Sequence, residues 1–196
     1  MKSPLALVAA ALFLGAAQTP PPQAAPPAPQ HIDLASKLIN TPESNWNAYG
    51  PDQTSKKLDK GGPQNYPAVE VTVDKPSTNA WDDGAVSSIP HAIGAGDAIL
   101  VAVYLRNPNL ADGRTETLPL VGATGGAAPY PAIAGAPANV TNQWKLHFAS
   151  GKAPQAFAAG AWQVTVHLAS AKHTIQLGPI RVYDLGPNFD LKRLPH

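Results

Sequence analysis

The chain has 196 residues, with 14 Lys and Arg against 13 Asp and Glu and a formal net charge of +1. This balance gives no electrostatic basis for binding nucleic acid or an anionic membrane surface, so we expect a neutral or weakly charged partner. The sequence contains no cysteine, so an exported form would rely on packing or on a bound metal rather than on disulfides.

The N-terminal stretch has the features of an export signal followed by a linker. Lys2 precedes an apolar run at residues 5–14, and small residues lead to a plausible cleavage site after Ala17. The run is short for a membrane-spanning helix, and an uncleaved anchor is the weaker alternative. Dense prolines at residues 18–30 favour an extended spacer. We therefore predict a signal peptide at 1–17, a Pro-, Ala- and Gln-rich linker at 18–30, and a secreted or periplasmic protein with no membrane insertion after cleavage.

Residues 31–196 are predicted to form one domain, whose clearest strand is 98–106. One face of this strand is expected to be core, and the other changes along its length from small apolar residues to Tyr104 and Arg106. The expected core positions are Ile99, Val101, Val103 and Leu105.

Other short runs also alternate with a period of two, and no window sustains a helical period. They lie at residues 69–73, 144–148, 162–168, 175–177 and 180–182. Trp144 and Trp162 share parity with apolar neighbours, which assigns both to the core. Residues 118–140, rich in Gly, Ala and Pro, are expected to hold one or two short strands in an irregular excursion. This pattern predicts an all-β fold, an antiparallel sandwich or barrel.

Residues arranged for catalysis are scarce. There is no cysteine nucleophile, no Gly-x-Ser-x-Gly turn, and no tight histidine cluster of the kind that binds zinc. Of the carboxylates that could serve glycoside hydrolysis, the adjacent Asp82 and Asp83 would point to opposite faces of a strand, and Glu116 stands alone. The sequence therefore indicates no catalytic site.

The polar faces of the expected strands carry a recurring set of side chains. These are Tyr104, Arg106, Lys145, His147, Gln163, Thr165, His167, Gln176 and Arg181. If the strands are neighbours in one sheet, these side chains line one surface. Planar amides, guanidinium and imidazole groups match vicinal hydroxyls, as in sugar binding. The alternative is the ordinary solvated face of a sandwich.

Several motifs in order resemble the cellulose- and xylan-binding modules of the family 4 and family 9 type. They are Trp81, then Gly96-Asp97 before a strand ending in Arg106, then Gln143-Trp144-Lys145, and a closing strand that ends at Asp184-Leu185-Gly186. The resemblance implies a galactose-binding-like jelly roll, and it implies that a glycoside hydrolase accompanies the module. Residues 38–46 resemble the family's first strand, but the usual Gly-Asn-Gly-Phe-Glu start, where a structural calcium is often bound, is absent.

We therefore predict an exported β-sandwich that binds a neutral polysaccharide or oligosaccharide without cleaving it, with a glycoside hydrolase encoded separately. Tyr104 and Arg106 are the first ligand-binding candidates. The others are Lys145, His147, Gln163 and His167 on neighbouring strands, and Trp81 as an aromatic stacking residue. Arg106 could instead pair with Glu70 or Asp82. No cofactor is expected, with a structural calcium left open. The alternatives are a structural or interaction module of the cell envelope, and a small glycoside hydrolase or polysaccharide lyase on the same fold.

Overall fold

A computed structural model describes residues 33–194, and the predicted signal peptide and linker lie outside these residues. The strands are β1 (Asn47–Tyr49), β2 (Gln53–Leu58), β3 (Ala68–Val73), β4 (Gly84–Ser88), β5 (Ala98–Arg106), β6 (Glu116–Gly125), β7 (Ala132–Val140), β8 (Lys145–Lys152), β9 (Trp162–His167) and β10 (His173–Asp184). Short 3₁₀ helices occupy η1 (Ala35–Lys37), η2 (Pro63–Asn65) and η3 (Leu191–Arg193). Within this part of the chain, no helix is long and apolar enough to cross a bilayer.

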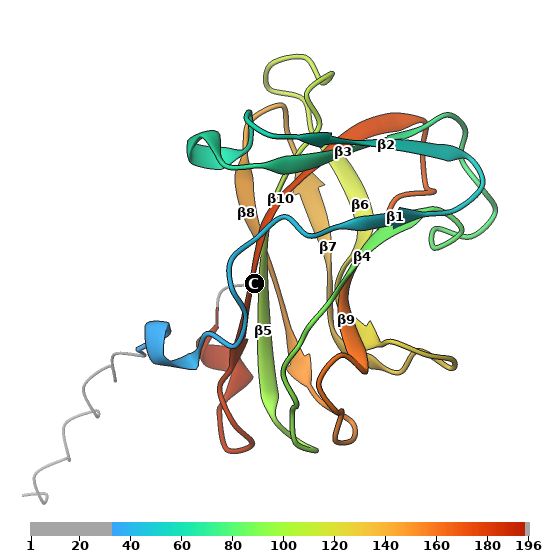
Figure 1. Cartoon of the computed structure of the whole chain (residues 1–196). Helices are drawn as coiled ribbons and strands as arrows, with labels where there is room; N and C mark the ends of the chain where they lie inside the picture. The colour runs from blue at the N-terminus through green and yellow to red at the C-terminus, as the bar shows by residue number, and fades with distance from the viewer. Residues whose placement is uncertain (1–32, 195–196) are drawn as a thin grey trace, which may run out of the picture. The chain divides into compact units, whose positions relative to one another are not determined.

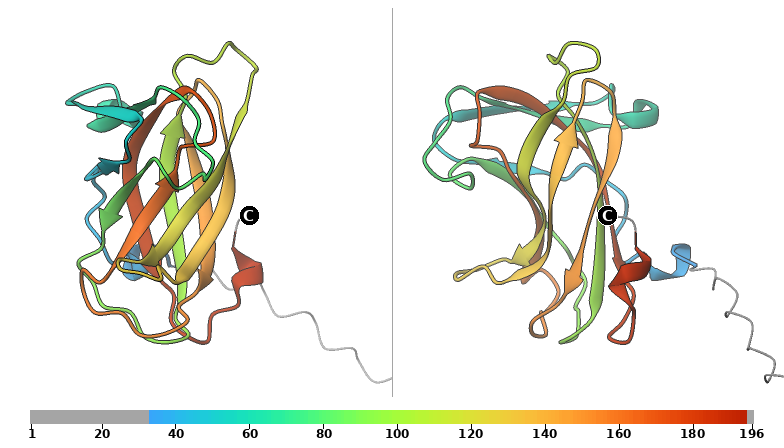
Figure 2. Two further views of the ribbon diagram at one scale, coloured as in Figure 1. Left: turned by 90° about the vertical axis from the view of Figure 1, so that its right-hand side faces the viewer. Right: turned by 180° about the vertical axis from the view of Figure 1, so that it is seen from behind.

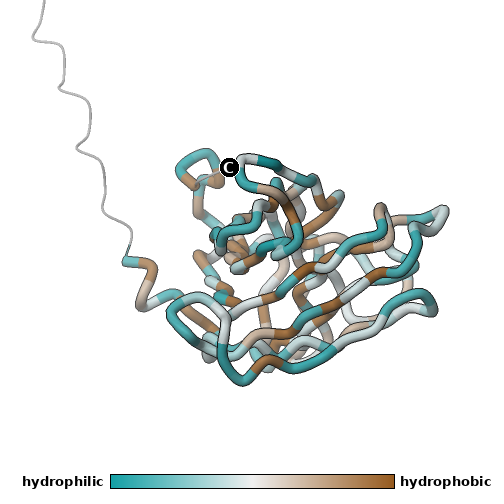
Figure 3. Tube along the Cα trace, turned by 90° about the horizontal axis from the view of Figure 1, so that it is seen from above, coloured by the Kyte–Doolittle hydropathy of each residue, from teal (hydrophilic) through white to brown (hydrophobic). Residues whose placement is uncertain are grey.

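The strands form two antiparallel sheets of five strands each, packed face to face (Figures 1 and 2). The order is β2-β3-β10-β5-β8 in one, here called the β5 sheet, and β1-β4-β9-β6-β7 in the other, the β9 sheet. Hydrophilic and hydrophobic residues alternate along many strands (Figure 3), as expected when one face of each sheet is buried. The predicted all-β sandwich is confirmed.

The core lies between the two sheets. In β5, Ile99, Val101, Val103 and Leu105 are all fully buried, as their alternation predicted. β9 contributes Trp162, whose indole Nε1 donates to the carbonyl of His91 at 2.7 Å. The assignment of Trp162 to the core is confirmed.

The other face of β5 is covered at one end only. Ala98 and Leu100 form a second, smaller apolar cluster with Leu185 and Leu194 from the C-terminal segment. Toward the other end of the strand, Tyr104 and Arg106 are only partly buried. The C-terminal segment thus leaves one polar, aromatic end of this face uncovered.

The orientation predicted for β8 is wrong. The register pairs Val103 with His147 and Tyr104 with Leu146, so His147 points toward the core side and Leu146 toward the outside. Trp144 is therefore not in the core, and its Nε1 donates to the carbonyl of Gly61 at 3.0 Å. Period-two patterning does not say which face is inward when a strand lies at a sheet edge and both faces are partly covered.

The expectation of an irregular excursion at residues 118–140 is also wrong, because β6 and β7 form a long hairpin there. Small residues let these backbones approach closely. Gly122 pairs with Gly135, and a Cβ at Gly122 would lie 2.1 Å from the carbonyl oxygen of Ala134. Glycine is therefore a packing requirement of this hairpin rather than a sign of irregular structure.

β10 changes its neighbour part-way along its length. Residues 173–177 pair with β3, and the register with β5 shifts between Leu177 and Ile180. Beyond the shift, residues 38–43 replace β3, through bridges at Leu38 and Glu43. The first-strand resemblance of residues 38–46 thus corresponds to a bridged segment, closed by a hydrogen bond from Trp46 Nε1 to the carbonyl of Gly178 at 2.9 Å.

Candidate functional site

The structure divides the sequence-predicted site residues between two sheets. Tyr104 and Arg106 lie on the outer face of the β5 sheet, and Lys145 starts the adjacent edge strand β8. Gln163 and His167 lie on the outer face of the β9 sheet. The premise that all these strands are neighbours in one sheet is therefore wrong, and the candidates do not form one surface.

The outer surface of the β9 sheet, here called the β9 face, combines exposed aromatic rings with polar side chains. Its residues are Tyr49, Trp81, Val86, Ser88, Leu120, Thr124, Gln163, Thr165 and His167. Trp81 is 59% exposed, and its ring lies in a T-shaped arrangement with the His167 ring, with centroids 6.3 Å apart. Tyr130, 56% exposed in the β6–β7 loop, lies close enough to Tyr49 to interact electrostatically. A face of this kind offers both stacking and hydrogen bonding.

Two glycines lie near the middle of the β9 face. Gly84 lies under Tyr49, since a Cβ at Gly84 would be 2.6 Å from the tyrosine hydroxyl. That hydroxyl hydrogen bonds with Thr165, and burial raises the pKa of Tyr49. Gly122 lies opposite Thr165 on the next strand. The Tyr49 ring therefore packs against the backbone at Gly84, in the space that a side chain there would fill, and is held in place by its contact with Thr165.

Burial also affects the histidines predicted as ligand contacts. It lowers the pKa of His167 below its usual value of 6.5. Burial, and then the charge of Lys145, lower the pKa of His147 in the same direction. Nε2 of His147 is buried without a hydrogen-bond partner, which fits a neutral ring at the core edge better than a ligand contact.

These shifts predict that the free energy of unfolding falls as the pH drops below about 6.5, because the unfolded chain takes up protons before the folded one does. Replacing His167 with Gln removes one such group and should reduce the slope in this window, while the two proteins should share the same slope above pH ~7. Urea denaturation at a series of pH values measures this. Parallel slopes for parent and variant below pH ~6.5 would contradict it.

A polar ladder crosses the outer face of the β5 sheet. Lys56 pairs with Glu70 at 2.8 Å, and Gln176 Nε2 donates to Glu70 at 2.6 Å. Arg106 Nε then donates to Gln176 Oε1 at 2.6 Å, and its guanidinium lies 4.8 Å from the Trp144 ring centroid. Burial alone would raise the pKa of Glu70, but hydrogen bonds from Lys56 and Gln176 and the charges of Lys56 and Arg106 lower it overall. Gln176 thus links Arg106 to Glu70. This arrangement is close to the alternative expectation that Arg106 pairs directly with Glu70.

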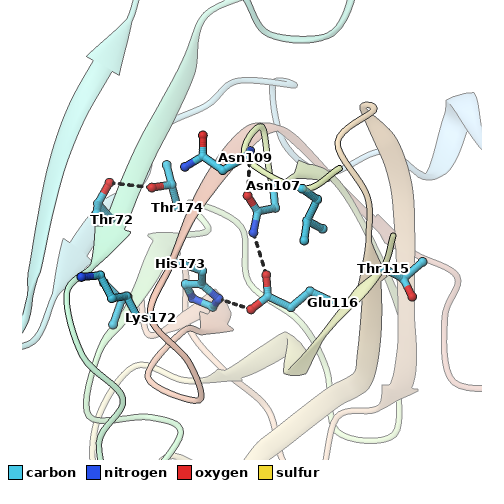
Figure 4. A pocket seen from close by; sticks show the side chains of 10 residues that line it. Thr72, Asn107, Asn109, Thr115, Glu116, Lys172, His173 and Thr174 are labelled. Atoms are coloured by element: carbon cyan, nitrogen blue, oxygen red, sulfur yellow. Dashed lines mark hydrogen bonds and ion pairs between the residues drawn. The ribbon is translucent and has the colours of Figure 1, made fainter. Parts of the chain in front are cut away.

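A cavity of about 470 Å³ lies at one end of the sandwich, between β3 and β10 of one sheet and β6 of the other. We call it the end pocket. In Figure 4, Glu116 and His173 point toward one another across it. The Glu116 carboxylate accepts from Nδ1 of His173 at 2.6 Å and from Nδ2 of Asn107 at 2.7 Å. Glu116, which stands alone in the sequence, therefore joins the two sheets.

The end pocket lacks the groups for glycoside hydrolysis. That reaction uses two carboxyl groups across the scissile bond, and Glu116 is the one carboxylate among the described residues that line the pocket. Nε2 of His173 is buried and has no hydrogen-bond partner. Sequence reasoning missed the Glu116–His173 contact because 57 positions separate the two residues and no motif links them.

The Glu116 contacts predict a stability effect. In Glu116→Gln, one of the two donors to this side chain, His173 or Asn107, faces an NH₂ group instead of an oxygen. Losing that hydrogen bond should lower the free energy of unfolding by about 1–3 kcal/mol. Urea denaturation of the variant measures this loss. Glu43→Gln, at an exposed position, should change stability by less than about 0.5 kcal/mol, and equal effects of the two substitutions would contradict the prediction.

The residues present do not fit a calcium site built from side chains. Calcium takes several oxygen ligands, carboxylates prominent among them. Within residues 33–194, no group of three or more His, Cys, Asp or Glu is placed to hold a metal ion. We assign no role to a metal.

No protein-family model and no curated protein sequence matches the chain. Solved structures do resemble it. One is the family 22 carbohydrate-binding module with its glycoside hydrolase family 10 module from a Clostridium thermocellum xylanase, complexed with xylohexaose (TM-score 0.57, 16% identity, 78% of this chain). The chain spans 29% of that protein's length.

Two further matches are modules on their own. A xylan-binding family 22 module from Paenibacillus barcinonensis matches with TM-score 0.52 and 14% identity, over 76% of this chain and 94% of the other. The second N-terminal cellulose-binding domain of a Cellulomonas fimi β-1,4-glucanase matches with TM-score 0.53 and 20% identity, over 76% and 95%. The chain therefore has the β-sandwich fold of these carbohydrate-binding modules, the fold that its sequence motifs predicted.

Proposed function

We propose that this protein binds a neutral polysaccharide on the β9 face, without cleaving it. The observation that carries the proposal is the contact of the largely exposed Trp81 ring with His167 on the outer face of the β9 sheet. An exposed ring can stack on the C–H face of a pyranose, and Gln163 and His167 supply hydrogen-bonding groups for its hydroxyls. The solved modules of the same fold, described as xylan-binding and cellulose-binding, support this class of ligand.

The site proposed here retains three of the sequence candidates, Trp81, Gln163 and His167. It adds Tyr49, at the end of β1, and Tyr130, in the β6–β7 loop. The two lie close enough to interact electrostatically. Because the interaction uses stacking and hydrogen bonds to a neutral chain, its strength should depend little on salt.

The proposal extends to the rest of the chain. Residues 1–17 act as a signal peptide and 18–30 as a linker, so that the domain works outside the cytoplasm. A glycoside hydrolase is the expected partner, because the similar structure from Clostridium thermocellum carries its module beside a glycoside hydrolase module.

Affinity electrophoresis tests the proposal. The purified protein should migrate more slowly in native gels containing soluble xylan, β-glucan or mannan, and should release no reducing ends from the polysaccharide that retards it. Unchanged migration on every neutral polysaccharide would overturn the proposal and favour a structural or interaction module. Release of reducing ends would favour the hydrolase alternative.

A further inference from the structure

A second concave site lies on the outer side of the β5 sheet, away from the β9 face. It has a volume of about 220 Å³, and its walls include Tyr66, Tyr104, Arg181 and the rings of Pro63 and Pro179. Pockets that enclose a drug-sized ligand usually measure about 300–1,000 Å³, so this one suits a single ring. We call it the Tyr104 pocket.

Beneath this pocket, a glycine lets neighbouring side chains approach the backbone closely. Gly178 lies at the β10 register shift, and a Cβ there would be 2.9 Å from Cβ of Tyr104 and 3.1 Å from Cδ of Pro63. Tyr104 and Pro63 are therefore held against the sheet. Tyr66, which follows η2, stays 54% exposed.

Arg181 carries a charge that no carboxylate in residues 33–194 neutralises. Its guanidinium lies 5.5 Å from the Tyr104 ring centroid, a cation–π contact, and it takes part in none of the ion pairs of the described residues. Glu43 bridges to the neighbouring Ile180, but its carboxylate accepts from Asn45. The nearby Arg106, by contrast, is engaged by Gln176.

A planar guanidinium with free donors matches a carboxylate, which it can bind through two parallel hydrogen bonds. The exposed Tyr66 ring beside it provides a surface for the C–H face of a sugar ring. We propose that the Tyr104 pocket binds a uronic acid residue of an acidic polysaccharide, with its carboxylate on Arg181 and its ring against Tyr66. This site lies on a different sheet from the β9 face and goes beyond the proposed binding of neutral polysaccharide.

The test compares native gels containing polygalacturonate with gels containing neutral arabinoxylan. The parent should be retarded by polygalacturonate, and less so at high salt, because the contact is between charges. Arg181→Gln should weaken uronate binding at least about tenfold, since a charge-assisted contact is lost. It should leave migration on arabinoxylan unchanged.

Two further variants make the result decisive. Arg114→Gln removes the same charge from an exposed loop position and should leave uronate binding unchanged. Arg181→Lys keeps the charge and the aliphatic stem but not the planar fork, so it should fold even if Arg181→Gln does not, and should still bind uronate more weakly than the parent.

Retardation by polygalacturonate that Arg181→Gln and Arg181→Lys both retain at parental strength would overturn the inference, as would no retardation at all. The inference would also be overturned if dextran sulfate retarded the parent as strongly as polygalacturonate does and Arg114→Gln weakened this retardation as much as Arg181→Gln does. That result would show a general attraction to polyanions. Because Trp81→Ala acts on the β9 face, its effect on neutral polysaccharide tests the proposed function separately.

Discussion

Val101→Asp is expected to unfold the protein or to lower its free energy of unfolding by about 3–5 kcal/mol or more, because it places an uncompensated charge in the core. Val101 is fully buried on β5, and its cross-strand neighbours, Ala149 and Val182, are apolar and buried as well. A domain has about 5–15 kcal/mol of stability in total, so this loss is a large part of it. Urea denaturation followed by circular dichroism measures the effect.

The choice of Val101 over Val103 matters for this experiment. Val103 lies opposite His147, whose Nε2 has no hydrogen-bond partner, so an aspartate at 103 could gain a partner there. Ser55→Asp is the matched control, because it introduces the same charge at an exposed position of β2 and should cost less than about 0.5 kcal/mol. A Val101→Asp protein with the same denaturation midpoint as the parent would show that the inner face of β5 is wrongly assigned.

Trp81→Ala is expected to weaken neutral polysaccharide binding by roughly thirtyfold, since truncating a tryptophan that anchors a binding surface typically costs about 2 kcal/mol or more. The ring is largely exposed and makes a single T-shaped contact with His167, so its removal should change the stability by less than about 0.5 kcal/mol. Affinity electrophoresis on the polysaccharide that retards the parent gives the ratio of dissociation constants.

Two variants accompany Trp81→Ala. Trp81→Phe keeps an aromatic face and should retain most of the binding. Tyr66→Ala removes a ring of similar exposure from the Tyr104 pocket, and binding of neutral polysaccharide should stay at the parental level. If Trp81→Ala binds as tightly as the parent, the β9 face is not the site, and the polar ladder around Arg106 becomes the surface to test.

Local pattern was sufficient to predict the strands that cross the centre of the sandwich. In β5 and β9 the inner positions are fully buried and apolar, so burial imposes the period of two directly on the sequence. It was not sufficient for β8, at the edge of the β5 sheet. There Phe148 packs on the smaller cluster formed with the C-terminal segment, and His147 faces the inner side. Both faces of such a strand carry apolar residues, so the alternation does not show which face points toward the core.

The sequence by itself determined the all-β class, the inner face of β5 and the side-chain types suited to sugars. Which of those side chains share a surface was decided only by the tertiary structure. Sheet order places β9 with β4 and β6, and β5 with β10 and β8, so Trp81 meets His167 on one face while Tyr104 meets Arg181 on the other. Strand pairing depends on contacts between residues far apart in the chain, and the alternation within a strand carries no information about its neighbours.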